Sequence, residues 1–331
     1  MDAYIQGISY YLPQQTLNNT QIAELFPEWS AEKIASKVGI TERHIAAANE
    51  TATDMAIQAA EKLFSEYDIH RSSIDFVLLC TQSSDYCLPS SACLIQHKLG
   101  LKTQCGAFDF NLGCSGYEYG LAVSKGLIAS GVAKNILLLT SETYTKYIHP
   151  QDRGNRTIFG DGATATLIST HGFAKIGDFS LGTDGAGAKY LIVESGGARH
   201  QQPYNDVIST DDGKTMSKDN LYMDGEAIFN FSADVVPQMI EDVLVKNHLT
   251  QEDISLFVFH QANKYMINYL RKLVNIDKDK FYVYMEKVGN TVSSTIPIAL
   301  CEAKKEGKLC GHILLAGFGV GLSWGATILS V

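Results

Sequence analysis

The chain has 331 residues, of which 45% are hydrophobic and 19% charged, a balance that predicts a globular protein with a large core. Its formal net charge is −9 and it carries no basic tail or long Lys/Arg block, so we expect no nucleic-acid binding. The first residues lack a basic start followed by a long apolar stretch, and no window approaches the roughly 18 to 20 apolar residues of a membrane span. These features favour a cytoplasmic protein with no membrane partner.

The spacing of cysteines and histidines gives no sign of a metal site. The seven cysteines are an odd set without a Cys-x-x-Cys pair, which argues against a disulfide framework and against a thiolate zinc site. The nine histidines show neither His-x-x-x-His nor His-Glu-x-x-His spacing. We therefore expect no bound metal.

The first half of the chain predicts alternating strands and helices. Strands are expected over residues 4–11, 74–81, 107–110, 135–140 and 160–168. Helices are expected over 21–26 with Asn19 and Thr20 as the cap, over 33–38 closed by Gly39, from Thr51 through Phe64, and from Pro89 to Leu99.

The second half repeats this order, which predicts a duplicated α/β unit. The matching segments are 254–261 with 74–81, 287–291 with 112–115, 312–316 with 135–139, and 324–330 with 162–169. We therefore expect an α/β protein with an N-terminal half over 1–170 and a C-terminal half over 171–331, related by a pseudo-two-fold axis.

Cys114 follows the apolar run 107–110 and lies between small residues, where a strand, a tight turn and a helix start are expected. Backbone N–H groups without an intrahelical partner, together with the helix dipole, would then face the thiol. We expect them to lower its pKa and favour the thiolate, the form that attacks carbonyls. The alternative is that Cys114 is a small buried side chain with only a packing role.

Two further residues follow from the duplication. Asn290 lies on the turn equivalent to that of Cys114, and His260 ends the strand equivalent to 74–80. All three would then approach the seam between the halves, beyond strand C-termini, where α/β sheets bind their ligands. Taken singly, His260 could equally be a hydrogen-bonded core histidine and Asn290 an ordinary turn residue.

Seven motifs together resemble one family. They are GITERHIA at 39–46, GCSG at 113–116, FGDGA at 159–163, MDG at 223–225, HQAN at 260–263, GNT at 289–291 and GFGVGLSWG at 317–325. The chain resembles, nearly end to end, the β-ketoacyl-acyl carrier protein synthase III family of the thiolase-like superfamily. That resemblance implies a five-layered α-β-α-β-α fold. Elongating synthases carry a second histidine where this chain has Asn290, so the set favours the initiating type.

The resemblance also implies an acyltransferase that needs no cofactor. Cys114 would take the acyl group of an acyl-CoA, with the backbone N–H groups of Cys114 and Val320 as the oxyanion hole. Malonyl-acyl carrier protein would then bind, and His260 with Asn290 would stabilise the enolate left by loss of CO2. Because donation requires a neutral imidazole, we expect activity to fall between pH 8 and pH 5 as His260 is protonated.

Contacts to the substrates carry over unevenly. Trp29 matches the residue that stacks on the CoA base, and Tyr265 stands where the family has an arginine. The other positions implied for CoA or pantetheine are Lys37, which replaces an arginine, Arg156, Gly225, Phe229 and Asn263. The expected docking face for the acidic carrier protein is Lys264, Arg271 and Lys272.

Leu88 stands where short-chain members carry a phenylalanine that a dimer partner inserts at the end of the acyl pocket. We therefore expect a homodimer and a primer longer than acetyl, used in fatty acid or specialised lipid-like synthesis. Two other functions stay open. One is acyl transfer to an oxygen or nitrogen acceptor without decarboxylation, and the other is a non-catalytic partner subunit.

Overall fold

The computed structural model describes residues 1–209 and 215–331. Its helices are α1 (Asn19–Leu25), α2 (Ala31–Val38), α3 (Ala52–Glu66), α4 (Ser91–Lys98), α5 (Gly116–Ala129), α6 (Arg153–Arg156), α7 (Gly225–Lys246), α8 (Lys264–Leu273) and α9 (Thr295–Lys305). Its strands are β1 (Tyr4–Tyr11), β2 (Gln15–Asn18), β3 (Glu42–Ile45), β4 (Phe76–Cys80), β5 (Gly106–Phe110), β6 (Asn135–Glu142), β7 (Gly162–Ser169), β8 (Ala174–Thr183), β9 (Leu191–Ile192), β10 (Ile208–Ser209), β11 (Thr215–Met216), β12 (Tyr222–Met223), β13 (Ile254–Phe259), β14 (His312–Gly319) and β15 (Ser323–Ser330).

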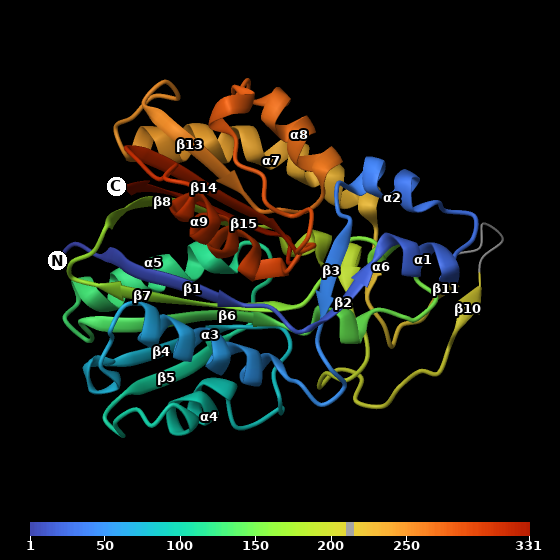
Figure 1. The fold of residues 1–331 in the computed structure, drawn as a ribbon, viewed down its shortest axis with the longest axis horizontal. Coiled ribbons are helices and arrows are strands. Elements are labelled where there is room, and N and C mark those ends of the chain that lie inside the picture. Colours follow the sequence, from blue (N-terminus) through green and yellow to red (C-terminus); the bar gives the residue numbers. More distant parts are fainter. Residues whose placement is uncertain (210–214) are drawn as a thin grey trace.

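Five layers stack in the order α-β-α-β-α (Figure 1). Helices α3 and α4 pack on the strands of the first half, and α7 packs on β8, β14 and β15 of the second. Helix α5 contacts strands of both halves, and α9 contacts β1, β7 and β13, so these two helices form the middle layer. This arrangement confirms the predicted fold class. Helices cover both faces of the strands in each half, because both faces of these strands are apolar.

The strand order repeats between the halves. Nine strands of the described chain form one hydrogen-bonded network in the order β13-β14-β15-β8-β1-β7-β6-β4-β5. Outward from the centre, β8-β15-β14-β13 therefore mirrors β1-β7-β6-β4. The two sets join through only two antiparallel pairs, Tyr4 with Lys175 and Ile5 with Ala174. The proposed boundary between residues 170 and 171 falls in the link from β7 to β8.

Local capping signals are confirmed at two helices. Gly39 ends α2 at φ +73°, a left-handed conformation that glycine adopts without strain. Thr51 and Asp54 form a reciprocal capping box at the start of α3.

Three helix starts were predicted wrongly. Helix α2 begins at Ala31, with Ser30 as its cap, rather than at residue 33. The cap of α1 is Asn18, which shares a capping box with Gln21, whereas the amide of Asn19 is buried and donates to the Ile40 carbonyl at 2.8 Å. Helix α4 begins at Ser91 rather than at Pro89. The Asp109 carboxylate from β5 accepts hydrogen bonds from the backbone N–H groups of Ser91 and Ala92, both at 2.6 Å. A long-range side chain thus sets this helix start.

Within the described residues, no helix combines the length and the apolar character that a membrane crossing requires.

Candidate active site

Cys114 lies on a tight turn between β5 and α5. Gly113 closes the turn by accepting a 2.8 Å hydrogen bond from the Gly116 N–H. A Cβ atom on Gly113 would overlap Val320, and one on Gly116 would overlap the Cys80 sulfur. Glycine is therefore needed on both sides of Cys114, because only the bare backbone fits between these neighbours.

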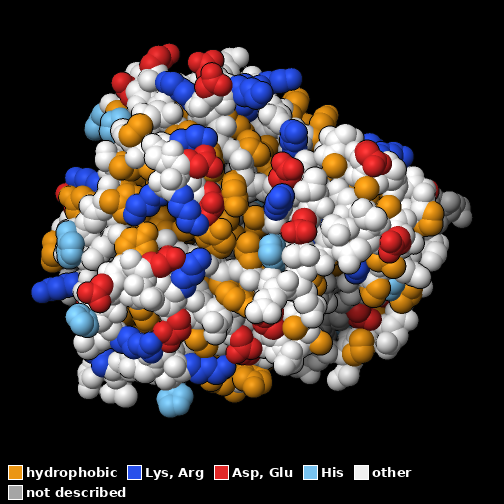
Figure 2. Space-filling model, viewed as in Figure 1, with side chains coloured by type: hydrophobic (Ala, Val, Ile, Leu, Met, Phe, Trp, Pro, Cys, Tyr) orange, Lys and Arg blue, Asp and Glu red, His pale blue; other side chains and the backbone are white. Residues whose placement is uncertain are grey.

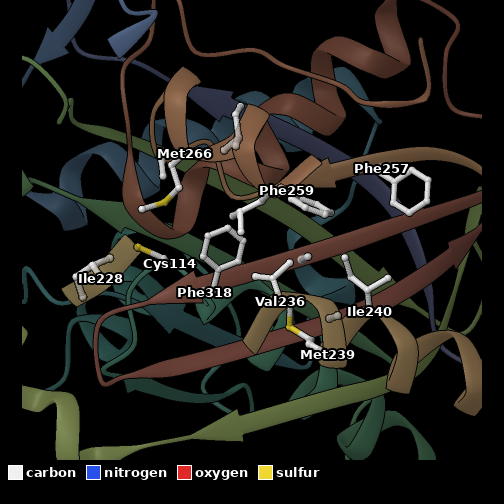
Figure 3. Close-up of a cluster of buried hydrophobic side chains, with 14 of the residues drawn as sticks. Cys114, Ile228, Val236, Met239, Ile240, Phe257, Phe259, Met266 and Phe318 are labelled. Carbon is white, nitrogen blue, oxygen red and sulfur yellow. The ribbon is translucent and has the colours of Figure 1, made fainter. Parts of the chain in front are cut away.

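The Cys114 thiol is buried rather than exposed at an open helix end. The side chain is 8% exposed and belongs to a large apolar cluster, where Figure 3 shows it at the end that also holds Ile228 and Met266. Burial raises the pKa of the Cys114 thiol to about 12, while the backbone N–H groups of Val320 and of Cys114 itself act to lower it. The expected lowered pKa is therefore corrected, since desolvation outweighs the N–H groups. The resting group is a neutral thiol.

Val320 directly follows Gly319, the last residue of β14, and the chain at this point lies against the Cys114 sulfur. A Cβ atom on Gly319 would lie 2.8 Å from the Cys114 Sγ. The N–H groups of Cys114 and Val320, the two predicted oxyanion donors, thus both act on the Cys114 sulfur, and their role as an oxyanion hole stays a prediction.

His260 follows β13 directly and is 2% exposed. Its backbone N–H donates to the Ala316 carbonyl at 2.8 Å, and its ring Nδ1 lies 2.7 Å from the Thr295 hydroxyl. Burial lowers the pKa of His260 to about 3. The expected protonation of His260 between pH 8 and pH 5 is therefore not supported, because burial favours the neutral imidazole.

Asn290 lies on the turn before α9 and is 4% exposed. Its backbone bonds to the residues on either side of Phe159. The Asn290 carbonyl accepts from the Gly160 N–H at 3.0 Å, and the Asn290 N–H donates to the Ile158 carbonyl at 2.9 Å. The side-chain oxygen accepts from the Val292 N–H at 2.9 Å. This last bond fixes the orientation of the amide, so its NH2 group is the donor side.

Val292 links these residues to each other. Its N–H bonds to Asn290, while its carbonyl accepts from the Thr295 hydroxyl at 3.0 Å and acts on the His260 ring. Its side chain also approaches the Cys114 turn, because Val292 Cγ1 would lie 3.3 Å from a Cβ atom on Gly113. The structure thus gathers the three predicted residues around one turn.

Two cavities adjoin at Leu221, which lines both. The first, which we call the inner cavity, has a volume of about 560 Å³. Val320, Tyr144 and Leu191 are among its lining residues, so it adjoins the Cys114 turn. The second, which we call the outer cavity, has a volume of about 580 Å³ and is lined by Trp29 and Gly225 among others. The two cavities therefore approach each other at Leu221, one from the side of Trp29 and the other from the side of the Cys114 turn.

Sequence reasoning missed an arginine at the outer cavity. The Arg153 guanidinium lies 5.6 Å from the centre of the Trp29 ring and 2.7 Å from the Glu28 carboxylate. Arg156, the predicted residue, instead lines a separate cavity of about 250 Å³ with Thr145 and Phe159. The structure therefore does not bring Arg156 to Trp29. The signal that could have identified Arg153 is its place directly after Asp152, the residue that caps the short helix α6 ahead of the FGDGA segment.

The remaining positions expected near CoA lie around α8. Asn263 caps this helix by accepting from the Met266 N–H at 2.9 Å. Phe229 stacks with Tyr265 at a ring-centre distance of 5.8 Å, so the tyrosine in place of an arginine makes an aromatic contact. Lys37 is exposed in the last turn of α2, a helix that packs on α8.

The expected docking residues do not form one open face. Lys264 and Lys272 are exposed on α8, and Figure 2 shows basic side chains over this upper part of the molecule. Arg271 is half-buried and donates to the Ile276 carbonyl at 2.7 Å, which ties its guanidinium to the helix end. Docking at all three residues stays a prediction, and Arg271 is the least accessible of them.

Leu88 is 81% exposed and is absent from the lining of its own chain's cavity beside Cys114. Its assignment to a partner's pocket stays a prediction. Among the described residues, no group of three or more His, Cys, Asp or Glu side chains could hold a metal ion.

Comparisons with known proteins agree in one description. Residues 108–185 match 3-oxoacyl-[acyl-carrier-protein] synthase III, and residues 244–331 match its C-terminal domain. The chain is 36% identical to the β-ketoacyl-[acyl-carrier-protein] synthase III of Clostridium perfringens over 333 residues, covering 100% of this chain and 99% of the relative. A crystal structure of a 3-oxoacyl-(acyl-carrier-protein) synthase III is 46% identical with a TM-score of 0.97, covering 100% of both chains. The Thermus thermophilus enzyme of the same name is 32% identical with a TM-score of 0.87, covering 99% of each.

Proposed function

We propose that this chain, which belongs to the β-ketoacyl-[acyl-carrier-protein] synthase III family, condenses an acyl-CoA primer with malonyl-acyl carrier protein in fatty acid or related lipid synthesis. It is an enzyme of the transferase class. The observation that carries the proposal is the position of Cys114, whose sulfur meets the N–H groups of Cys114 and Val320 where the inner cavity begins. A single nucleophile with two convergent donors is what acyl transfer requires.

In the first step, Cys114 attacks the thioester carbon of the primer. A bond forms between its sulfur and that carbon, and the negative charge on the carbonyl oxygen is met by the N–H groups of Cys114 and Val320. The carbonyl re-forms as the C–S bond to CoA breaks. Because burial keeps the Cys114 thiol neutral, its proton must leave during attack, and the departing CoA sulfur takes one up, so the step is proton-neutral overall.

In the second step, malonyl-acyl carrier protein replaces CoA. His260 and the Asn290 NH2 group would donate to the oxygen of its thioester, so that the electron pair freed by loss of CO2 forms a stabilised enolate. The enolate carbon then attacks the acyl group, a carbon–carbon bond forms, and the Cys114 sulfur leaves as a thiolate that takes up one proton from solvent to return to the resting thiol. For the His260 Nε2 to donate, its Nδ1 must accept. The Thr295 hydroxyl lies 2.7 Å from Nδ1 and 3.0 Å from the Val292 carbonyl and has a single hydrogen, so the proposed mechanism requires that hydrogen to turn from the carbonyl to Nδ1.

Trp29 and Gly225 would contact CoA in the outer cavity, with Arg153 as an added cation and Lys37, Phe229 and Asn263 nearer α8. Arg156 is left out of this set. The lining of the outer cavity by Trp29, Gly225 and Arg153 supports these three residues, whereas Lys37, Phe229 and Asn263 rest on the family resemblance.

A homodimer is part of the proposal. Strand β5 lies at an edge of the sheet, so its outer hydrogen-bonding groups can pair with a second copy. The large exposed apolar side chains of Tyr86, Leu88 and Phe108 lie on or before this edge strand. In such a dimer, Leu88 would reach the partner's acyl pocket. The proposed substrates are cytoplasmic metabolites, which supports a cytoplasmic location.

Intact-mass measurement with a panel of acyl-CoAs, followed by malonyl-acyl carrier protein, tests the function. An acyl adduct that is absent in Cys114→Ala and is discharged with release of CO2 is the expected result. An adduct that malonyl-acyl carrier protein cannot discharge would instead indicate transfer without decarboxylation. No adduct with any donor would refute the proposal.

A further inference from the structure

The inner cavity beside Cys114 has a hydrogen-bonded polar network in its wall. The Gln82 side chain connects this network, because its Nε2 donates to the Asn111 Oδ1 at 2.9 Å and its Oε1 accepts from the Tyr144 hydroxyl at 3.3 Å. All three side chains line the cavity. The backbone N–H of Gln82 in turn donates to the buried Glu142 carboxylate at 2.9 Å, which anchors the residue that carries the network.

The Gln82 side chain of this network lies against the turn that carries Cys114. A Cβ atom on Gly113 would lie 2.9 Å from the Gln82 Oε1 and would overlap Val320, so the Gln82 amide and the oxyanion donor flank the same turn. The Tyr144 ring is 4% exposed and close enough to Cys114 for the two groups to interact electrostatically. An acyl chain that extends from Cys114 into this cavity would therefore meet these polar groups.

An unsubstituted alkyl chain fits this wall poorly. Covering a polar group without giving it a partner costs about 1–3 kcal/mol. Gln82 has a second N–H on its amide, Asn111 has an NH2 group, and the Tyr144 oxygen can accept as well as donate. A hydroxyl group, which both donates and accepts, can satisfy such a mixed set, and a methylene cannot.

We propose that the Gln82–Asn111–Tyr144 network selects acyl primers that carry a hydroxyl group on the first carbons beyond the thioester carbonyl, in preference to alkyl primers of equal length. The inference rests on the proposed function, because it specifies the primer held on Cys114. It assigns to these three residues a role in substrate choice and leaves the chemistry to Cys114, His260 and Asn290.

The test compares two substrates that differ by one oxygen atom, butyryl-CoA and 3-hydroxybutyryl-CoA. The rate of Cys114 acylation is followed by intact mass for each. Wild type should acylate at least about tenfold faster with the hydroxylated primer, the ratio that corresponds to about 1.4 kcal/mol, within the range for one polar group left unpaired. Gln82→Leu and Tyr144→Phe should each bring the ratio towards one, mainly by speeding acylation with butyryl-CoA.

Ser84→Ala is the matched control, because Ser84 lines the same cavity outside the network and is exposed. It should keep the wild-type ratio. Equal or faster acylation by butyryl-CoA in wild type would overturn the inference while leaving the condensing function intact, as would a preference unchanged in both network variants. Failure of every acyl-CoA to acylate Cys114 would instead overturn the proposed function.

Discussion

Replacing Thr295 with valine should impair decarboxylation while sparing acylation. Thr295 is 3% exposed, and its hydroxyl contacts both the His260 Nδ1 at 2.7 Å and the Val292 carbonyl at 3.0 Å. Valine keeps the shape but removes the hydroxyl. Without that hydroxyl, no Thr295 hydrogen can be given to Nδ1, and a proton on Nδ1 that bonds the Val292 carbonyl becomes favoured. Nε2 would then lack the proton that the proposed mechanism needs.

The magnitude follows from a hydrogen bond lost in a fully buried site. Leaving a buried polar atom without its partner costs about 1–3 kcal/mol, which corresponds to a rate loss of about 5- to 150-fold. We expect this loss in the release of CO2 from malonyl-acyl carrier protein. Acylation of Cys114 should change by less than about threefold, since its oxyanion donors are the N–H groups of Cys114 and Val320.

Two separate assays distinguish the steps. Intact-mass time courses with an acyl-CoA report acylation, and CO2 release from malonyl-acyl carrier protein by the pre-acylated enzyme reports decarboxylation. Thr295→Ser is the matched control, because it keeps the hydroxyl and should restore most of the CO2 release. If Thr295→Val releases CO2 within about twofold of wild type, Thr295 does not position His260 and the proposed tautomer is wrong.

Three further predictions concern protonation, space at the nucleophile and carrier docking. Because burial lowers the pKa of His260 to about 3, CO2 release at saturating substrate should stay nearly constant from pH 8 to pH 5 and fall only towards pH 3; a midpoint near 6.5 would show a solvated imidazole. Gly319→Ala should reduce acylation at least about 100-fold with little change in circular dichroism, because the added Cβ would lie 2.8 Å from the Cys114 sulfur; near-normal acylation would refute that packing. Lys264→Glu with Lys272→Glu should raise the KM for malonyl-acyl carrier protein several-fold, less so at high salt, and leave the KM for acyl-CoA unchanged; equal effects on both would exclude docking on this face of α8.

Short-range signals could be predicted from the sequence. Gly39 ends α2 and the Thr51–Asp54 box starts α3 because those signals act within a few residues of the chain. The start of α4 could not, since Asp109 satisfies its first N–H groups from a strand 17 residues or more away.

The identities of the three central residues were also accessible from the sequence. The repeated order of strands and turns placed Cys114, His260 and Asn290 at equivalent or adjacent strand ends, and the family motifs agreed with that placement. Arg153 and Arg156 could not be separated in this way, because two arginines three residues apart in a short helix enter different cavities.

The sequence by itself determined the α/β class, the duplication and the residue types at the centre, because periodicity and motif spacing are properties of the linear chain. Only the tertiary structure decided how those groups ionise. The thiol of Cys114 and the imidazole of His260 both remain neutral because packing from distant segments removes water from them, and burial penalises the charged form of either group. Desolvation depends on what surrounds a side chain in three dimensions, and no local pattern in the sequence records it.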